Sequence, residues 1–376
     1  MKITNRTYIA TILVLLCTTV ALFYALAFSS SVAPPTQDET AESNQPLYQW
    51  RLVTTWPKEF PGLGMAPENF ANLVNRMSNG RIEIQVFGAG EIVGALEVFD
   101  TVSSGAAEMG HGAAYYWKGK SQAAQFFTSV PFGMTAQEYN GWLHYGGGLE
   151  LWRDIYQRFN LVPFAGGNTG VQMGGWYKRE INQIEDLQGL KIRMPGLGGE
   201  VINRAGGTTV NIPGGELYTS LKTGVIDATE WVGPYNDLAF GFYEVADYYY
   251  YPGFHEPGAS LEFIINQDVW NELPSDLQAI IEGAARAINQ DMLDEYTARN
   301  NAALEELVNE HGVQLRRMPP EVFQHLKTIS FELYDEISAQ DEEFANVWQS
   351  YRRFLEGVEN YHSISEEAYY EERRGR

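Results

Sequence analysis

The segment Gly189-Leu-Lys-Ile-Arg-Met-Pro-Gly-Leu-Gly-Gly-Glu200 decides how the rest of the chain is organised. Lys191 to Met194 has the pattern of a strand, and the proline and glycines after it allow a tight turn into a helix that we expect to begin near Glu200. Arg193 therefore lies near the carboxyl end of a strand, where open α/β sheets bind their ligands. Its guanidinium suits a carboxylate, to which it can donate two parallel hydrogen bonds. A surface or salt-bridging arginine is the alternative on this stretch alone.

The first residues have the order of an export signal. Met1 to Arg6 is basic, and Thr7 to Phe28 is almost entirely apolar. A small-residue cleavage site at Ala25-Leu-Ala27 predicts a signal peptide over residues 1–27. An uncleaved membrane anchor is the alternative, because an apolar run of this length can just span a bilayer. Residues 28–47 are rich in Ser, Pro, Thr, Gln and acids, which predicts a linker.

Composition excludes several classes of function. The chain has 376 residues, a formal charge of -22 and one cysteine, Cys17, inside the predicted signal. The exported part therefore has no thiol and no disulfide, which suits an oxidising compartment and excludes cysteine catalysis. A chain this acidic repels phosphate backbones, so nucleic acid is not an expected partner. A small anionic ligand would have to be attracted by local positive charge, because the overall field opposes it.

An internal repeat predicts the architecture. Glu97-Val-Phe-Asp-Thr-Val-Ser-Ser-Gly-Ala-Ala-Glu108 has the same order of acid, apolar pair, small polar residues, glycine and strand as Glu216-Leu-Tyr-Thr-Ser-Leu-Lys-Thr-Gly-Val-Ile-Asp227. Two such units predict two similar α/β lobes that face each other, although chance is the alternative. The helical pattern of Ser275 to Glu310 is long enough to act as a strut between lobes. Pro320 to Gln340 and Asp341 to Gly357 are further helices, which serve either as a partner surface or as cover for a sheet.

Enzyme motifs give little support to catalysis. Gly196-Leu-Gly-Gly199 follows a strand, but Val201 occupies the place of the third glycine of a dinucleotide-binding fingerprint. The sequence has neither a phosphate-binding loop nor a Gly-x-Ser-x-Gly elbow, and its six histidines show no paired metal spacing. We therefore favour binding over catalysis.

A second charged group follows a neighbouring strand. Val225 to Thr229 has strand character and delivers Glu230 and Trp231 at its carboxyl end. Glu230 would repel a carboxylate ligand unless a cation lay between them, which predicts a metal ion held by hard oxygen ligands from Glu230 and Gln172. The ion is Na⁺ by preference, with Ca²⁺ as the alternative. A direct ion pair between Glu230 and Arg193 is the competing explanation.

Neutral groups complete the predicted pocket. The amides of Asn168 and Gln172 can satisfy the remaining oxygens of an anion. Tyr115, Tyr116 and Trp231 are candidates for its walls, although aromatic residues make up 13% of this chain and are more often part of the core.

Five segments together resemble a known family, the extracytoplasmic solute receptors of tripartite ATP-independent periplasmic (TRAP) transporters, and in particular their 2-oxoacid-binding branch. The resemblance covers about Trp50 to Leu307. Its motifs are Gly110-His-Gly-Ala-Ala-Tyr-Tyr-Trp-Lys-Gly119, Gly166-Gly-Asn-Thr-Gly-Val-Gln-Met-Gly-Gly-Trp176, Lys191-Ile-Arg-Met-Pro-Gly-Leu-Gly-Gly199, Asp227-Ala-Thr-Glu-Trp-Val-Gly-Pro-Tyr-Asn-Asp237 and Tyr251-Pro-Gly-Phe-His-Glu-Pro-Gly258.

The resemblance implies a role for individual residues. It assigns the grip on the carboxylate to Arg193, and the bridging cation to Gln172, Glu230 and the backbone of Trp231. Asn168, Tyr115, Tyr116 and Glu256 lie in matching motifs, with Glu256 a further candidate metal ligand.

The resemblance also implies an α/β, two-lobe, periplasmic-binding-protein-like fold with a ligand cleft between the lobes, a long connecting helix and extra C-terminal helices. We predict lobe 1 over 48–165 and 259–285, lobe 2 over 166–258 and 286–340, and a C-terminal helix and tail over 341–376. The expected partners are the membrane permease subunits of a TRAP transporter and, through the C-terminal helices, a second copy of the chain. The expected location is the periplasm, or the membrane surface if the signal is retained.

The sequence thus favours a non-enzymatic receptor for a small 2-oxo or 2-hydroxy monocarboxylate, such as pyruvate or lactate, bound with a cation. An exported hydrolase or lyase with Glu230 as general base is the main alternative. A sensor or scaffold whose lobes respond to the ligand is a third hypothesis.

Overall fold

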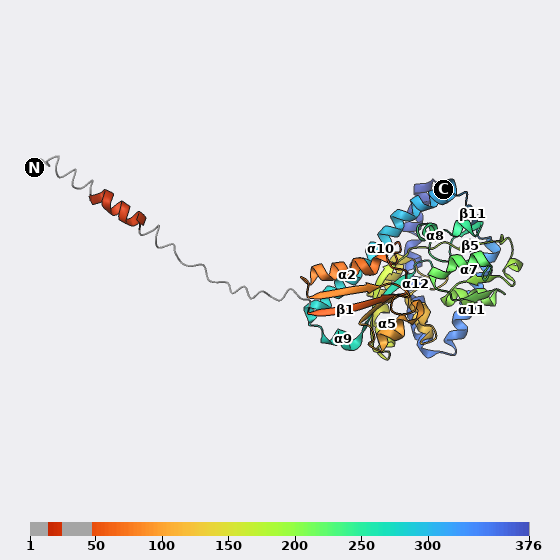
Figure 1. The fold of residues 1–376 in the computed structure, drawn as a ribbon. Coiled ribbons are helices and arrows are strands. Elements are labelled where there is room, and N and C mark those ends of the chain that lie inside the picture. The colour runs from red at the N-terminus through yellow and green to blue at the C-terminus, as the bar shows by residue number, and fades with distance from the viewer. Residues whose placement is uncertain (1–13, 25–46, 376) are drawn as a thin grey trace, which may run out of the picture. The chain divides into compact units, whose positions relative to one another are not determined.

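The computed structural model describes residues 14–24 and 47–375 (Figure 1). Residues 14–24 form a helix in which every residue is exposed. Over the described ranges, no helix has both the length and the hydropathy needed to cross a bilayer. The rest of the predicted signal and nearly all of the predicted linker lie outside the described residues, so both remain predictions.

One sheet has five strands in the order β2-β1-β3-β10-β4. Strands β1, β2 and β3 are parallel, and β10 is antiparallel to both of its neighbours. The edge strand β2 has alternating residues because one of its faces packs on the core, whereas β10 is buried along its whole length. The strand bounds are β1 Tyr48–Thr54, β2 Ile82–Phe87, β3 Met109–Gly112, β4 Leu161–Asn168 and β10 Ser260–Asn266.

The other sheet has six short strands in the order β11-β9-β5-β8-β6-β7. Strand β6 is parallel to both neighbours, and Arg193 at its end pairs in register with Thr229 of β8. Strand β8 is shorter than the predicted strand from Val225. The bounds are β5 Gly175–Tyr177, β6 Lys191–Arg193, β7 Thr208–Val210, β8 Ala228–Thr229, β9 Tyr248–Tyr251 and β11 Gln314–Arg317.

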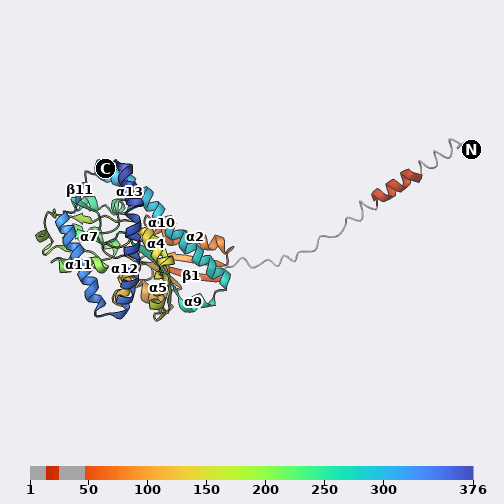
Figure 2. The same cartoon turned by 180° about the vertical axis from the view of Figure 1, so that it is seen from behind.

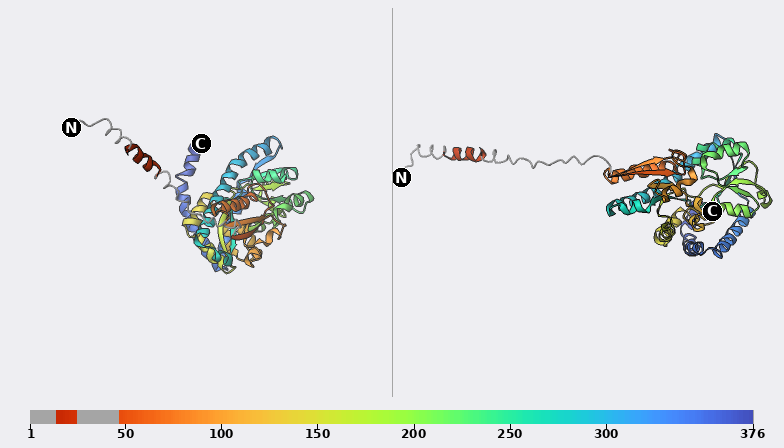
Figure 3. Two further views of the ribbon diagram at one scale, coloured as in Figure 1. Left: turned by 60° about the vertical axis from the view of Figure 1, so that its left-hand side comes forward. Right: turned by 60° about the horizontal axis from the view of Figure 1, so that its bottom comes forward.

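Each sheet belongs to its own half of the globular part. Figure 1 shows β1, α2 and α9 in one half and β5, β11 and α7 in the other, and the right-hand view of Figure 3 shows the same division. Helix α10 packs on β4 and α2 of the first half and on α8 of the second, which fits the predicted strut. The helix bounds are α2 Met65–Met77, α3 Val98–Ser103, α4 Ala136–Tyr145, α5 Gly148–Gln157, α6 Gly196–Arg204, α7 Leu217–Thr223, α8 Pro234–Phe240, α9 Gln267–Glu272, α10 Ser275–Asn309, α11 Pro320–Ser338, α12 Glu342–His362 and α13 Glu366–Arg374.

The predicted lobe boundaries are not marked by breaks between elements. Strand β4 runs through the predicted boundary at 165/166, and helix α10 runs through the one at 285/286. These exact boundaries therefore stay predictions, although β10 belongs to the first sheet and β11 to the second.

The two segments of the internal repeat adopt the same local structure. Each has a 3₁₀ turn (η1 Ala95–Glu97 and η5 Gly214–Glu216), a short helix (α3 and α7) and then a glycine with a positive φ, 76° in the first copy and 78° in the second. The acid that ends each copy accepts a backbone N–H from a strand: Glu108 from Arg51 at 2.7 Å, and Asp227 from Lys191 at 3.1 Å.

Helix α6 begins at Gly196, earlier than the predicted start near Glu200. The glycines expected in a turn before the helix instead form its first turn, where they allow neighbouring residues to approach closely. A Cβ at Gly199 would lie 2.3 Å from the carbonyl oxygen of Met194, and one at Gly198 would lie 2.7 Å from the Cβ of His255. Close packing, in addition to turn geometry, therefore requires glycine in this stretch.

The C-terminal helices mostly cover the core. Figure 2 shows α12 beside α4, α5 and α11. Its buried residues Phe344, Val347, Trp348, Tyr351 and Leu355 follow helical spacing, and the Tyr351 hydroxyl accepts the N–H of Met134 at 2.7 Å. Helix α12 extends past the predicted end at Gly357, and the acidic tail forms a further helix, α13, with no buried residue. The left-hand view of Figure 3 shows this last part of the chain projecting from the body.

Candidate functional site

Arg193 and Glu230 lie side by side at the carboxyl ends of adjacent parallel strands, as predicted. The N–H of Glu230 donates to the carbonyl oxygen of Arg193 at 3.2 Å. Their side chains form a direct ion pair between Arg193 Nη1 and Glu230 Oε1, and both are almost completely buried, at 1% and 0% exposure. This pair is the competing explanation that the sequence left open. Repulsion between Glu230 and a ligand is therefore not by itself an argument for a cation.

Further contacts hold the guanidinium of Arg193 in place. Its Nε donates to the carbonyl oxygen of Ile212 at 3.2 Å, and its Nη2 donates to the hydroxyl of Tyr116 at 3.0 Å. Its carbon Cζ lies 5.1 Å from the centre of the Trp231 ring, within the range of a cation–π contact. Because Nη2 carries two hydrogens, one of them is left for a ligand.

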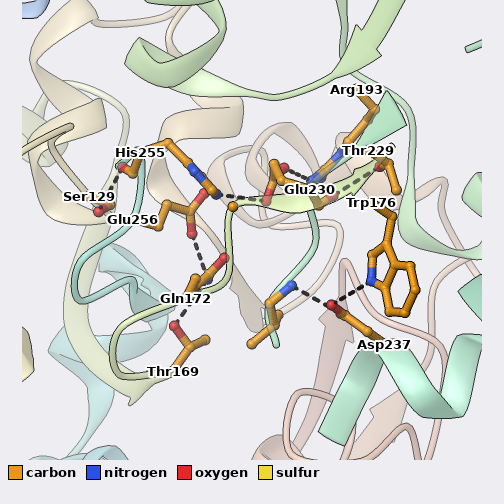
Figure 4. Close-up of polar contacts among 12 residues, drawn as sticks. Ser129, Thr169, Gln172, Trp176, Arg193, Thr229, Glu230, Asp237, His255 and Glu256 are labelled. Carbon is orange, nitrogen blue, oxygen red and sulfur yellow. Dashed lines mark hydrogen bonds and ion pairs between the residues drawn. The ribbon is translucent and has the colours of Figure 1, made fainter. Parts of the chain in front are cut away.

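Gln172 and Glu256 form a second polar pair beside the ion pair (Figure 4). Gln172 Nε2 donates to Glu256 Oε2 at 2.7 Å and to Thr169 Oγ1 at 3.0 Å. The backbone N–H of Gln172 donates to the carbonyl oxygen of Glu256 at 3.1 Å. The loop after β4 and the loop after β9 are thus fastened to each other, and the Gln172 amide has a defined orientation.

Several buried polar atoms in this cluster have no hydrogen-bond partner within the described residues. They are Glu230 Oε2, Gln172 Oε1, the indole Nε1 of Trp231 and both ring nitrogens of His255. Glu230, His255 and Glu256 each offer one atom that can coordinate a metal ion, and these three atoms lie within 4.8 Å of one another. Buried polar atoms are normally paired, so these unpaired atoms indicate that the site binds a further group. The two unpaired oxygens, Gln172 Oε1 and Glu230 Oε2, are suitable ligands for a hard cation such as Na⁺ or Ca²⁺.

The electrostatics of the cluster point the same way. Burial and the carboxylate of Glu230 raise the pKa of Glu256 well above its ordinary range. Burial and the nearby Glu256 raise the pKa of Tyr115. Burial alone would lower the pKa of Arg193, but the carboxylate of Glu230 outweighs it and raises that pKa. The negative charge of Glu256 is therefore disfavoured when no cation is bound, and a cation bound beside it would favour that charge.

The aromatic candidates lie around the guanidinium. Tyr115 and Tyr116 come from η2 (Ala114–Trp117), and their ring centres are 4.7 Å apart. The Trp231 ring packs edge-on against Trp56 at 6.0 Å and Phe60 at 6.5 Å between ring centres. Residues from the first half of the molecule thus close over Arg193 and Trp231 of the second.

Asn168 lies near the cluster but contacts the loop backbone. Its Oδ1 accepts the N–H of Gly170 at 2.9 Å, and its Nδ2 donates to the carbonyl oxygen of Gly258 at 3.4 Å. These contacts shape the loop that carries Gln172. A direct contact between Asn168 and a ligand stays a prediction.

The sequence interpretation missed His255 and Trp56. His255 lies in the quoted motif that ends at Gly258, yet only its neighbour Glu256 was selected, because a lone histidine has no spacing signal. Trp56 follows β1, and its Nε1 donates to His111 Nδ1 at 2.9 Å. Nothing in the sequence indicates that its ring reaches Trp231, because that contact joins distant elements.

Comparison with known proteins identifies the family. Residues 52–341 match the DctP model, described as bacterial extracellular solute-binding protein, family 7. This chain belongs to that family. Its members are solute-binding receptors, in agreement with the resemblance deduced from the sequence motifs.

Three similar proteins carry informative names. A monocarboxylate 2-oxoacid-binding periplasmic protein from Nostoc sp. is 42% identical over 334 residues, which cover 89% of this chain and 91% of the relative. A TRAP periplasmic solute binding protein from Pseudoalteromonas atlantica, solved with sodium and pyruvate, has a TM-score of 0.84 and 45% identity, covering 86% of this chain and 98% of that one. A TRAP transporter solute binding protein from Bordetella bronchiseptica, solved as a mixed-occupancy dimer with copurified calcium and picolinate, has a TM-score of 0.86 and 36% identity, covering 88% and 98%. The two-lobe fold predicted from the sequence is confirmed.

Proposed function

We propose that this chain is the extracytoplasmic receptor of a TRAP transporter for a small 2-oxo or 2-hydroxy monocarboxylate, pyruvate-like or lactate-like, bound together with Na⁺ or Ca²⁺. The observation that carries the proposal is a buried, restrained Arg193 beside two buried oxygens, Gln172 Oε1 and Glu230 Oε2, that accept no hydrogen bond from the described residues. The ligands named for the similar proteins, pyruvate and picolinate, are carboxylates with a second polar atom next to the carboxyl group.

Each site residue has a separate role toward the ligand carboxylate, the cation or the surrounding water. Arg193 supplies positive charge and the free hydrogen of Nη2 to the ligand carboxylate. Gln172, Glu230 and the backbone of Trp231 hold the cation, with Glu256 close by. The cation, when bound, attracts the oxygens of the ligand. Tyr115, Tyr116 and the Trp231 ring exclude water, which strengthens every charge interaction inside. Asn168 holds the loop of Gln172 and lies within reach of the ligand.

Catalysis by Glu230 is the less favoured alternative. A general base must be free to accept a proton, whereas one oxygen of Glu230 is engaged by Arg193 and the other is a proposed cation ligand. We therefore infer that the bound acid leaves unchanged. Recovery of intact pyruvate after prolonged incubation supports this, whereas a product that appears in proportion to the protein would favour the enzyme.

Calorimetry on the exported domain, stripped of metal with a chelator, tests the proposal. Pyruvate is titrated in choline chloride alone and with added Na⁺ or Ca²⁺, and we expect at least one of the cations to raise the affinity strongly. Arg193→Ala should lower the affinity by roughly 3 to 5 kcal/mol, because it leaves a buried carboxylate without its partner. Arg204→Ala removes a half-exposed arginine that pairs with Glu336 at 2.6 Å, and serves as the matched control. Equal affinities in all three buffers would remove the cation from the proposal.

Location and partners follow from the same proposal. We infer export by residues 1–27 into the periplasm, with retention at the membrane if that segment is not cleaved. TRAP permease subunits would receive the ligand. The exposed side chains of Tyr361, Ile364 and Tyr369 near the C-terminus are an apolar surface for a homodimer. Sedimentation of the exported domain, with and without residues 364–376, tests the dimer.

A further inference from the structure

His255 is a buried polar residue whose ring makes no hydrogen bond with the described residues. It lies in the loop after β9, between Phe254 and Glu256, and is 2% exposed. Its Nε2 lies 3.4 Å from Glu230 Oε2 without the geometry of a hydrogen bond, and among the described residues neither ring nitrogen has a hydrogen-bond partner. Figure 4 shows the ring directed at the carboxylate of Glu230, on the side where Gln172 and Glu256 also lie.

Packing holds the imidazole in this position. The missing side chain of Gly198 makes room for it, because a Cβ there would lie 2.7 Å from the Cβ of His255. The Phe254 ring lies edge-on to the imidazole, with 5.5 Å between ring centres, and Ser129 Oγ donates to the carbonyl oxygen of His255 at 3.4 Å. The glycine-rich start of α6 therefore places His255 as well as Arg193.

Burying an imidazole without a hydrogen bond costs folding free energy. We therefore infer that a polar atom of the ligand bonds to it. In the proposed function, Arg193 binds the carboxylate of the ligand, and the unpaired oxygens of Gln172 and Glu230 coordinate the cation. The oxygen on the second carbon of the ligand, which the cation also attracts, still lacks a contact from a side chain. Two unpaired groups of the cluster are available for it, the indole Nε1 of Trp231 and the imidazole of His255, and the imidazole is the one that lies beside Glu230 Oε2. A neutral imidazole has one donor and one acceptor nitrogen, so it can donate to a keto oxygen or accept from a hydroxyl.

We propose that His255 contacts the C2 oxygen of the bound monocarboxylate and makes the receptor prefer 2-oxo and 2-hydroxy acids to acids without that oxygen. The inference rests on the proposed function and adds a specificity residue to it. Arg193 and the cation attract any small carboxylate. His255 distinguishes pyruvate and lactate from propionate, which would leave the imidazole unpaired.

Two substitutions separate this role from a structural one. His255→Leu removes both ring nitrogens, and His255→Gln keeps a donor and an acceptor. Affinities for pyruvate and L-lactate are measured by calorimetry with saturating Ca²⁺, and that for propionate by displacement of pyruvate. We expect His255→Leu to weaken pyruvate and lactate by about tenfold or more and to change propionate by less than about twofold. His255→Gln should recover most of the loss.

The controls make each outcome decisive. His325→Leu replaces a histidine on α11, outside the cluster, and should change nothing. An equal loss for pyruvate and propionate in His255→Leu would mean that His255 only positions Glu230 or the cation, and would overturn the inference. Unchanged pyruvate affinity would also overturn it. If the natural chain binds pyruvate in a cation-dependent way, the proposed function stands even when one of these two outcomes overturns the role of His255. If the natural chain shows no such binding, the proposed function itself is rejected.

Discussion

Gln172 Nε2 donates to Glu256 Oε2 at 2.7 Å, which fixes the direction of the Gln172 amide. The second hydrogen of the same nitrogen goes to Thr169 Oγ1 at 3.0 Å. Both donor positions are therefore used, and Oε1 is left without a partner among the described residues. An acceptor that is held in place and unsatisfied is what a hard cation requires. In the proposed function, Gln172 is thus oriented as a cation ligand before the ion binds.

Gln172→Met tests this preparation. Methionine fills nearly the same volume without an amide oxygen, so the cation loses one ligand. We expect the gain in pyruvate affinity on addition of Ca²⁺ to shrink by about tenfold or more, measured by calorimetry. Gln125→Met is the matched control, because Gln125 is equally buried but lies in η3 (Gln122–Phe127), outside the cluster. A calcium dependence equal to that of the natural chain would exclude Gln172 from the cation site.

Arg193 and Glu230 should be coupled in stability. In a cation-free buffer, Arg193→Met leaves the buried carboxylate of Glu230 unpaired and should lower the free energy of unfolding by roughly 3 to 5 kcal/mol. The double variant Arg193→Met with Glu230→Gln has no unpaired charge and should recover most of this loss. Denaturant unfolding of Arg193→Met, of Glu230→Gln and of the double variant measures the coupling. Losses that simply add in the double variant would argue against a direct pair.

Tyr296 fastens the two halves of the molecule together through Asn236. The Tyr296 hydroxyl on α10 donates to Asn236 Oδ1 at 2.6 Å, and Asn236 Nδ2 donates to the carbonyl oxygen of Pro61 at 2.8 Å. Tyr296→Phe leaves a buried acceptor unsatisfied and should lower the free energy of unfolding by about 1 to 3 kcal/mol. Tyr235→Phe removes a more exposed bond to Glu295 and should cost less than about 1 kcal/mol in the same assay. Equal losses would mean that burial does not set the cost.

Glu262 should make stability fall as pH rises. Burial raises its pKa from 4.5 to about 7, although Trp117 Nε1 and the Tyr156 hydroxyl donate to it. Between these two pH values the folded protein holds a proton that the unfolded chain has released, so the free energy of unfolding decreases with increasing pH. Glu262→Gln removes this contribution.

Urea unfolding at pH 4.5, 5.5 and 7 measures the effect of Glu262. We expect the stability of Glu262→Gln relative to the natural chain to rise across this window, whereas Glu83→Gln, at an exposed position of β2, should follow the natural chain. A relative stability that stays constant with pH would show that Glu262 titrates normally.

Gly199 should tolerate no side chain. A Cβ at this position would lie 2.3 Å from the carbonyl oxygen of Met194, in backbone that cannot move without shifting Arg193. Gly199→Ala should therefore lower the free energy of unfolding by roughly 1 to 3 kcal/mol and weaken ligand binding. Gly215→Ala is the control, since a Cβ there meets nothing within 4 Å. Thermal unfolding and calorimetry of both variants check the prediction, which fails if Gly199→Ala behaves like the control.

Local patterns predicted the regular elements well. The long helix was expected from Ser275 to Glu310 and is observed from Ser275 to Asn309, because helical spacing is read along one segment. The start of α6 was placed too late, because glycine signals a turn and close packing alike. The extent of β8 was also overestimated, since the strand is limited by its partners in the sheet.

The sequence by itself determined two α/β units, the long helix and the position of Arg193 and Glu230 at strand ends, because strands, glycines and helical spacing are local properties. Its motifs also identified the family. Only the tertiary structure decided that Glu230 pairs with Arg193 and that Gln172 faces Glu256. It also decided that the ring of His255 has no hydrogen bond to any described residue. The physical reason is that a hydrogen bond depends on the direction of a side chain and on packing between distant segments, neither of which is encoded in the spacing of residues along one segment.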